Sequence, residues 1–293
     1  MRNAALKPRE IEPDVYLPFG RHVTDTVISL TTRALLTVIR IDGTSFETAE
    51  TSDLNDLHGK LNLTLRNIAD PRLAVWTHFV RRRTSVYPDG AFRSAFAAEL
   101  DEQYRDRLRK EALFRNDLYL TLVCHPGRAA TDTAAAFFRR LGRSAGHSVE
   151  VDSEALKRLD DATRDIVAAL DRYGARAVGL VERGGITFSE PMELLHALAS
   201  GEWMPMPLPQ GPIGPALYSN RVIFGREALE IRGAGGSRFA GMFGLKEYPA
   251  STRPGLLNAL LSAPFELIVT QSFAFLAKAD AKTVLTRKQN QLV

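Results

Sequence analysis

The sequence has little cysteine and few of the residue patterns that build catalytic or metal sites. Its 293 residues contain one cysteine, Cys124, which excludes an internal disulfide and suits a reducing compartment. The six histidines show no i, i+4 pair and no cysteine partner, so a zinc site is not expected. No stretch matches the phosphate loop G-x-x-x-x-G-K-[ST], and the glycine cluster at 233–236 is interpreted as a tight turn. The sequence therefore predicts no catalytic, cofactor-binding or metal-binding residue and no ATPase activity for this chain alone.

Long apolar runs are scarce as well. The N-terminus lacks the apolar segment of a secretory signal, and the best candidate for a spanning helix, 256–269, is interrupted by Pro264 and Glu266. The net charge of +4 permits contact with anionic lipid or nucleic acid but does not require it. We expect a cytoplasmic protein without a transmembrane segment, associated with membranes only at the surface or through partners.

The first 125 residues alternate between strand and helix patterns. The predicted elements are strand 27–30, strand 34–41, helix 48–69, strand 73–82, helix 91–112 and strand 117–124. The second helix carries an apolar stripe formed by Phe92, Phe96, Leu100, Tyr104 and Leu108. This order favours an α+β fold, with mostly antiparallel sheets flanked by helices.

The sequence after residue 128 predicts a second group of helices and strands. These are helices 129–141, 153–173 and 189–201, strands 175–181, 220–224, 228–231 and 238–248, a short helix after Pro254, and an apolar strand 265–273 expected to be buried on both faces. Asp152-Ser153 are placed to cap the helix at 153–173, and Gly174 to stop it. The proline-rich stretch 204–215 is expected to be irregular.

These patterns divide the chain into two subdomains with connections. The predicted parts are an extended arm 1–22, a first α+β subdomain 23–128, a helical or α/β segment 129–203, a proline-rich loop 204–218, a second β-rich subdomain 219–276, and the start of a helix at 277–293. Because a basic helix is only starting where the sequence stops, we expect the chain to continue into a further domain.

Two clusters could carry chemistry. Cys124 and His125 are adjacent on a strand, so their side chains are expected to face opposite ways and not to form a nucleophile–base pair. Arg81, Arg82 and Arg83 form the basic cluster that is least interrupted by acidic residues. They are a candidate contact for an anion or a phosphate-bearing partner.

Several stretches resemble one known family. They are Tyr16-Leu17-Pro18-Phe19, followed by Phe46, and then Phe243-Gly244-Leu245-Lys246-Glu247-Tyr248-Pro249, Thr252-Arg253-Pro254-Gly255-Leu256-Leu257, Pro264-Phe265-Glu266, Thr270-Gln271-Ser272-Phe273 and Phe275-Leu276. They resemble the CagE/TrbE/VirB family of type IV secretion and conjugation ATPases, and specifically the N-terminal domain of its VirB-type traffic ATPase.

The resemblance implies a non-catalytic assembly and docking domain. The family's ATP site lies on a C-terminal domain, so ATP and Mg²⁺ are expected only for a full-length parent that powers pilus assembly and transfer of DNA or protein. It also implies self-association, inner-membrane channel components as partners, and a peripheral position at the inner membrane. Pro254 and Gly255 are expected to set a turn, and Phe265, Phe273 and Phe275 to fill a core. The alternative is a nucleic-acid-binding module that uses the surface around Arg81–Arg83, with DNA as partner.

Overall fold

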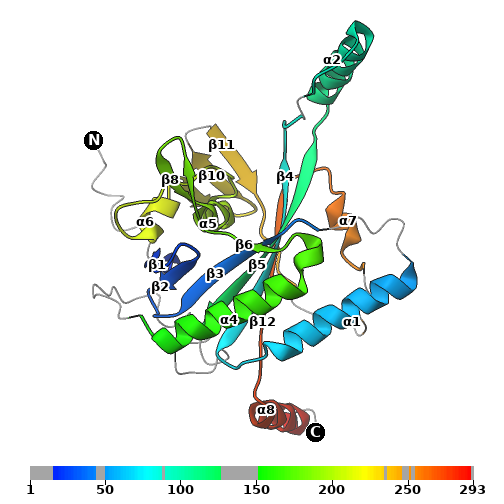
Figure 1. The fold of residues 1–293 in the computed structure, drawn as a ribbon. Coiled ribbons are helices and arrows are strands. Elements are labelled where there is room, and N and C mark those ends of the chain that lie inside the picture. Colours follow the sequence, from blue (N-terminus) through cyan, green and yellow to red (C-terminus); the bar gives the residue numbers. More distant parts are fainter. Residues whose placement is uncertain are drawn as a thin grey trace.

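The computed structural model describes residues 16–43, 50–87, 90–126, 151–233, 236–245, 251 and 255–291. Its main sheet is antiparallel, with the strand order β1-β2-β3-β5-β4-β12 and with β6 beside β3. The strands of this sheet are β1 (Phe19–His22), β2 (Val27–Leu30), β3 (Leu35–Ile41), β4 (Leu73–Arg83), β5 (Phe114–Cys124), β6 (Arg176–Ala177) and β12 (Leu267–Ala274). The predicted α+β class with antiparallel sheets is therefore confirmed (Figure 1).

Helices and smaller sheets surround this sheet. The helices are α1 (Thr51–Asn67), α2 (Ala95–Lys110), α4 (Ser153–Ala169), α5 (Glu190–Ser200), α6 (Ile213–Leu217), α7 (Asn258–Leu261) and α8 (Lys278–Gln291). The smaller sheets are the pair β7 (Leu180–Arg183) and β8 (Ile186–Ser189), and the three strands β9 (Arg221–Phe224), β10 (Leu229–Gly233) and β11 (Gly236–Ala240). The predicted helix 129–141, Phe46 and most of the predicted N-terminal arm lie outside the described residues.

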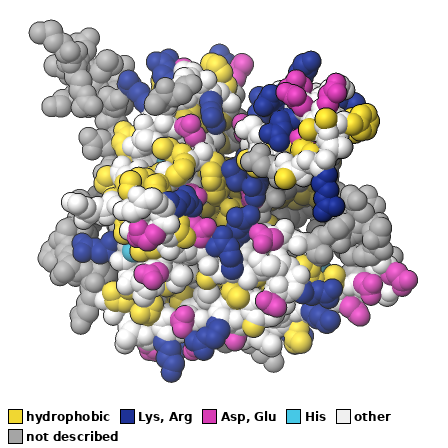
Figure 2. All heavy atoms as spheres, turned by 45° about the horizontal axis from the view of Figure 1, so that its top comes forward, with side chains coloured by type: hydrophobic (Ala, Val, Ile, Leu, Met, Phe, Trp, Pro, Cys, Tyr) yellow, Lys and Arg dark blue, Asp and Glu magenta, His cyan; other side chains and the backbone are white. Residues whose placement is uncertain are grey.

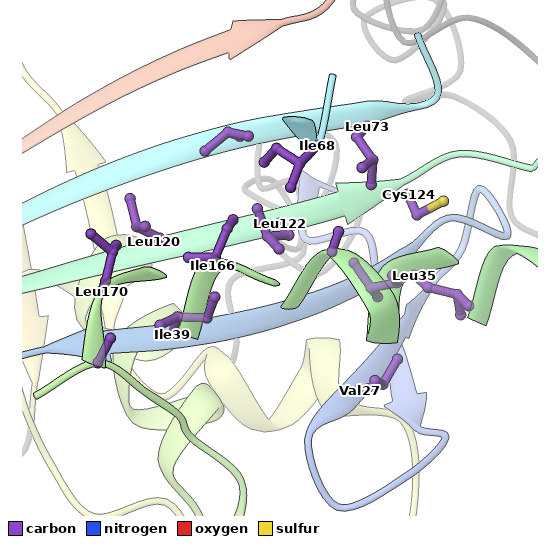
Figure 3. Packing of buried hydrophobic residues seen from close by; sticks show 14 of the residues in the cluster. Val27, Leu35, Ile39, Ile68, Leu73, Leu120, Leu122, Cys124, Ile166 and Leu170 are labelled. Carbon is purple, nitrogen blue, oxygen red and sulfur yellow. The ribbon is translucent and has the colours of Figure 1, made fainter. Parts of the chain in front are cut away.

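Both faces of the main sheet are buried, because apolar residues occupy consecutive positions along its central strands. On one face, Leu159 and Ile166 of α4 pack against Ile39, Leu122 and Cys124 (Figure 3). On the other face, residues of β2, β3, β4 and β5 pack against α5 and α6, with Ile28, Val38, Val80, Val123, Met192, Leu194, Ile213 and Leu217 in one cluster. Successive side chains on a strand point to opposite faces, so a strand covered on both sides needs near-continuous apolar sequence.

The ends of α4 follow the predicted capping pattern. One carboxylate oxygen of Asp152, Oδ1, accepts hydrogen bonds from the backbone N–H groups of Glu154 at 3.0 Å and Ala155 at 3.2 Å. The α-helix ends at Ala169, earlier than predicted, and a 3₁₀ turn at Asp171–Tyr173 follows it. Gly174 then adopts a left-handed φ of 65°, which ends the helical segment.

Two strand predictions are wrong. The predicted strand 175–181 is divided: β6 pairs with β3, whereas β7 pairs with β8. Between them, a Cβ added to Gly179 would lie 2.9 Å from the backbone oxygen of Asp25, so the chain passes too close to a neighbour for a regular strand with side chains. The strand predicted to be buried on both faces, β12, lies at the sheet edge beside β4 and is largely exposed.

The expected core role of three phenylalanines is only partly correct. Phe273 and Phe275 are half-buried and pack against the cluster under α4, with their ring centroids 6.1 Å apart. Phe265 is 56% exposed, so its predicted core position is wrong. It precedes the edge strand, where covering side chains from a second layer are few.

The chain from 204 onward is organised differently from a single β-rich unit. The proline-rich stretch is not wholly irregular, because its end forms α6, in which Ile213 and Leu217 are buried. The strands β9, β10 and β11 form a sheet of their own, whereas β12 joins the main sheet through β4. The predicted subdomain boundaries stay predictions.

One helix stands apart from the rest. The long strands β4 and β5 extend beyond the body of the molecule and carry α2 at their far end (Figure 1). None of the residues of α2 is buried. The apolar stripe predicted on this helix therefore faces solvent instead of the protein core.

Candidate functional site

The predicted basic cluster Arg81–Arg83 lies at the end of β4 and is divided between the two faces of the sheet. In β4, Leu73 and Val75 belong to the cluster under α4, whereas Val80 belongs to the cluster on the opposite face. By strand alternation, Arg81 and Arg83 lie on the first side and Arg82 on the second. The three residues therefore do not form one continuous basic patch.

Arg81 stabilises the segment that contains α7. Its guanidinium donates hydrogen bonds to the backbone oxygens of Ala263 at 2.6 Å and Leu261 at 2.7 Å, and to Oδ1 of Asn116 at 2.9 Å. It also lies 4.5 Å from the ring centroid of Phe114. These contacts attach residues 255–266 to the main sheet, so the role of Arg81 is structural.

Arg82 belongs to a buried ionic network around Asp117. The side chain of Asp117 is 3% exposed and binds three guanidiniums, those of Arg115 at 2.6 Å, Arg82 at 2.9 Å and Arg40 at 3.7 Å. Arg82 also stacks on Trp203 at 4.5 Å from the ring centroid. Sequence reasoning did not identify Asp117, although a carboxylate inside an otherwise apolar strand is a signal for such a pair.

Arg83 makes fewer contacts than its neighbours. Its backbone N–H donates to Oε1 of Glu266 at 2.9 Å, and its guanidinium lies 6.0 Å from the ring centroid of Phe114. On the face of the molecule that Figure 2 shows, Lys and Arg side chains are intermixed with Asp and Glu side chains. Two of the three candidate arginines are thus committed to contacts within the protein.

The family-motif residues lie in three places. Gly244 is exposed after β11, Gly255 precedes α7, and Gln271 and Ser272 lie on the edge strand β12, paired with Thr77 and Trp76. Gly255 has a φ of 82° and its oxygen accepts from Asn258 N–H at 3.0 Å, as the predicted turn requires. Pro254 lies outside the described residues.

Two pairs of potentially reactive side chains, Cys124 with His125 and His22 with Ser189, each include a buried nucleophile. Burial raises the pKa of the Cys124 thiol to about 11 and lowers the pKa of His125, which is the reverse of an activated nucleophile and its base. His22 Nε2 lies 2.8 Å from Ser189 Oγ, but Ser189 is fully buried and its Oγ caps α5 by accepting from Met192 N–H at 3.2 Å. The Cys124 thiol and the Ser189 hydroxyl are therefore both shielded from solvent, whereas His22 and His125 are half-buried.

Sites for a metal or for nucleotide phosphates are also missing from the described part of the chain. No group of three or more His, Cys, Asp or Glu side chains there could hold a metal ion. Gly233 and Gly236 pair at the end of the β10–β11 ladder, on either side of the predicted tight turn, and residues 234 and 235 lie outside the described residues. A pocket of about 200 Å³ beside Arg21, His22 and Gln210 contains no paired carboxylates or exposed nucleophile.

Exposed aromatic side chains gather at two separate places. One is the stripe on α2, where Phe96 is 75% exposed. The other lies on β11 and just after it and consists of Phe239, Met242 and Phe243, which we call the distal aromatic patch. Phe224 on β9 is also exposed, but it pairs in register with Leu229 whereas Phe239 pairs with Glu230, so the two phenylalanines lie on opposite faces of the sheet. Phe243 is 99% exposed. Large exposed apolar groups of this kind mark interaction surfaces.

The arrangement thus defines an α+β domain whose described surface offers apolar contacts instead of a catalytic centre. Residues 26–131 match the family "Type IV secretion system ATPase VirB4/TrbE, N-terminal domain", and residues 176–293 match the "CagE, TrbE, VirB family, component of type IV transporter system". The chain belongs to this CagE/TrbE/VirB family, and the resemblance inferred from its sequence is confirmed.

Three relatives illustrate the similarity. The type IV secretion system protein virB4 of Bartonella henselae is 45% identical over 289 residues, which cover 99% of this chain and 37% of the relative. Protein virB4 of Agrobacterium fabrum is 36% identical over 283 residues, covering 96% and 35% respectively. The type IV secretion system protein PtlC of Bordetella pertussis is 32% identical over 300 residues, covering 99% and 35%. The chain thus spans little more than a third of the length of these relatives.

A membrane span was not expected from the sequence. Among the described residues, no helix combines the length and apolar character needed to cross a bilayer.

Proposed function

We propose that this chain is a non-catalytic assembly and docking domain of a type IV secretion system ATPase. Support comes from its membership of a family of type IV secretion components, together with the lack of a catalytic or phosphate-binding group among the described residues. In the proposed parent protein, ATP and Mg²⁺ bind outside this chain, and hydrolysis powers pilus assembly and transfer of DNA or protein. The domain itself is peripheral at the cytoplasmic side of the inner membrane.

The distal aromatic patch is the observation that carries this proposal. Phe239 and Phe243 are among its most exposed side chains. Aromatic residues supply most of the binding energy in many protein interfaces, because each buries a large area on contact. The sheet that carries the patch also ends in two edge strands, β9 and β11, whose free backbone groups can pair with an added strand. We assign this surface to inner-membrane components of the secretion channel.

Polar contacts hold this sheet to the body of the protein and keep the patch in position. Asn220 Nδ2 donates to Oε2 of Glu202 at 3.1 Å, and Arg238 NH2 lies 3.7 Å from Oε1 of the same carboxylate. Ile231 is the buried residue on β10. The patch therefore faces away from the core while its sheet stays anchored beside α5.

The experiment is capture of this chain by purified inner-membrane channel components of the same secretion system in detergent. The double variant Phe239→Ser/Phe243→Ser is expected to weaken capture about tenfold or more, because hot-spot aromatics each carry about 1–4 kcal/mol. The matched control is Phe96→Ser on α2, which leaves the patch intact and is expected to be captured like the wild type. Equal capture of wild type and double variant would contradict the assignment of the surface, and ATP turnover above background by this chain would contradict its non-catalytic role.

A further inference from the structure

The second exposed apolar surface, on α2, differs from the distal aromatic patch in being organised along one helix. Phe92, Phe96, Leu100 and Tyr104 are all exposed and recur every four residues. Residues four apart lie on the same side of a helix, so the side chains from Phe96 to Tyr104 form one stripe. With its 16 residues, α2 is about 24 Å long. The helix projects from the end of β4 and β5, so nothing in the body of the molecule blocks access to it (Figure 1).

The chain itself covers a neighbouring side of α2 and part of one end of the stripe, where the ring centroid of Tyr104 lies 6.5 Å from that of Tyr87. Tyr104 is still 54% exposed, and Phe96 and Leu100 are more exposed than Tyr104. Tyr87 donates a hydrogen bond from its hydroxyl to Oδ1 of Asp101 at 2.7 Å, and the guanidinium of Arg105 lies 4.5 Å from the Tyr87 ring centroid. Asp101 and Arg105 follow Leu100 and Tyr104 by one residue and thus lie about 100° further around the helix. The hairpin end therefore fixes one side of α2 and presents the stripe outward.

The charges of α2 are separated along its length. The N-terminal half contains Glu99, Asp101 and Glu102 and no basic residue, whereas the C-terminal half contains Arg105, Arg107, Arg109 and Lys110 with one acid, Asp106. The basic residues in the last turn of α2 suit the helix dipole, but its first turn has no acidic residue, so the dipole accounts only for the basic end. The dipole also does not explain an exposed aromatic stripe beside these charges.

Together, the stripe and the charge separation indicate which partner can pack against α2. A second α2 helix packed antiparallel places the acidic half of each helix against the basic half of the other, while the two stripes meet between them. Parallel packing would oppose like charges, and a partner of uniform charge would match only one half. A two-fold axis perpendicular to the helices generates this antiparallel pair between identical chains.

We infer that α2 is a self-association surface on which two copies of this chain pack their α2 helices antiparallel, burying Phe96, Leu100 and Tyr104. This inference rests on the proposed assembly function and deepens it by naming one partner and its binding surface. A contact confined to one helix buries less area than the interfaces of stable dimers. The expected dimer is therefore weak, with a dissociation constant of about 10 µM or above.

The test measures the oligomeric state of the chain by sedimentation equilibrium from about 1 to about 300 µM, a range that brackets the expected dissociation constant. The variant Phe96→Gln/Leu100→Gln is expected to weaken the dimer at least tenfold. Its melting temperature should not change, because α2 has no buried residue and glutamine is a good helix former.

Charge exchange tests the antiparallel arrangement. The variant Glu99→Lys/Glu102→Lys makes both halves of α2 basic, and Arg107→Glu/Lys110→Glu makes both halves acidic. Each variant alone is expected to be monomeric, and an equimolar mixture of the two is expected to associate. The matched control Asp160→Lys/Asp161→Lys has the same change of charge on the exposed side of α4 and is expected to dimerise like the wild type.

A wild type that stays monomeric over the whole range would overturn the inference, as would a dimer that the glutamine variant leaves unchanged or a charge-exchange mixture that stays monomeric. The proposed docking function is tested separately. The variant Phe239→Ser/Phe243→Ser should keep wild-type dimerisation, so loss of capture by channel components and loss of self-association can be assigned to different surfaces.

Discussion

The imidazole of His78 joins the edge strand β12 to the centre of the main sheet. Its Nδ1 lies 3.0 Å from Oγ1 of Thr270 on β12, and its Nε2 lies 3.1 Å from Oγ1 of Thr121 on β5. The side chain is almost fully buried, and burial lowers the pKa of His78 to about 4. His78 therefore stays neutral in the folded protein at neutral pH.

The first prediction follows from this pKa. The unfolded chain binds a proton at His78 near pH 6.5, whereas the folded chain binds it only near pH 4, so acidification between these values favours unfolding. Between pH 7.5 and pH 5 the contribution of His78 should lower the free energy of unfolding by about 2 kcal/mol. The loss should level off below the folded pKa of about 4.

Urea denaturation of the wild type and of His78→Asn at the two pH values measures this contribution. The asparagine variant should lose about 2 kcal/mol less than the wild type on acidification. Burial also lowers the pKa of His22 and His125, but both residues are present in both proteins and cancel in the comparison. An identical pH dependence of the two proteins would contradict the prediction.

The position of β12 shows what the sequence could not provide. The mostly apolar stretch 265–273 predicts a strand, and a strand exists at Leu267–Ala274. Its burial depends on its neighbours, and its one neighbour in the sheet, β4, is nearly 200 residues earlier in the chain. Local periodicity contains no information about such a pairing, so the prediction of burial on both faces failed while the prediction of a strand succeeded.

The same distinction applies to the candidate sites. Capping of α4 by Asp152 and the turn at Gly255 were predictable because each depends on residues a few positions apart. The roles of Arg81 and Arg82 were not, since their partners Ala263 and Asp117 come from other elements. The spacing of the α2 stripe was visible in the sequence, but only the fold shows that no other element covers it.

The second prediction concerns the carboxylate of Asp117. Replacing it with asparagine removes the negative charge that Arg40, Arg82 and Arg115 share. Arg40 keeps Asp42 at 3.3 Å, whereas Arg82 and Arg115 lose the carboxylate that binds them. Breaking a buried ion pair in this way should lower the free energy of unfolding by about 3 kcal/mol. Urea denaturation at pH 7 measures the loss.

The matched control for this prediction is Asp160→Asn. Asp160 pairs with Arg164 at 2.9 Å, but both side chains are exposed, so the change should cost less than about 1 kcal/mol. Equal effects of Asp117→Asn and Asp160→Asn would show that the buried network adds nothing to stability.

The third prediction concerns the nucleic-acid alternative. Arg81 and Arg82 are held by contacts within the protein, so few phosphate contacts are available around β4. We expect no shift of single-stranded DNA by this chain at about 50 mM salt, where electrostatic binding is strong. Binding that weakens with salt and is reduced in Arg83→Ala, which leaves the Arg81 and Arg82 contacts in place, would restore the alternative.

The fourth prediction concerns Cys124, whose thiol is fully buried beside Leu35 and Leu122 (Figure 3). Burial raises its pKa to about 11, so at pH 8 the thiol is inaccessible and almost entirely protonated. Because the thiolate is the reactive form, native protein should react with a thiol-specific disulfide reagent at least about a hundredfold more slowly than protein in 8 M urea.

Cys124 is the chain's one cysteine, so the reaction can be followed as a single absorbance change without background from other thiols. The rate should rise with urea as the sheet opens, because Cys124 lies at the end of β5 between β3 and β4, and modification requires these strands to separate from α4. Rapid stoichiometric modification of the native protein would contradict both the burial of Cys124 and its raised pKa. It would also restore the possibility of nucleophilic chemistry at Cys124-His125, which the packing under α4 otherwise excludes.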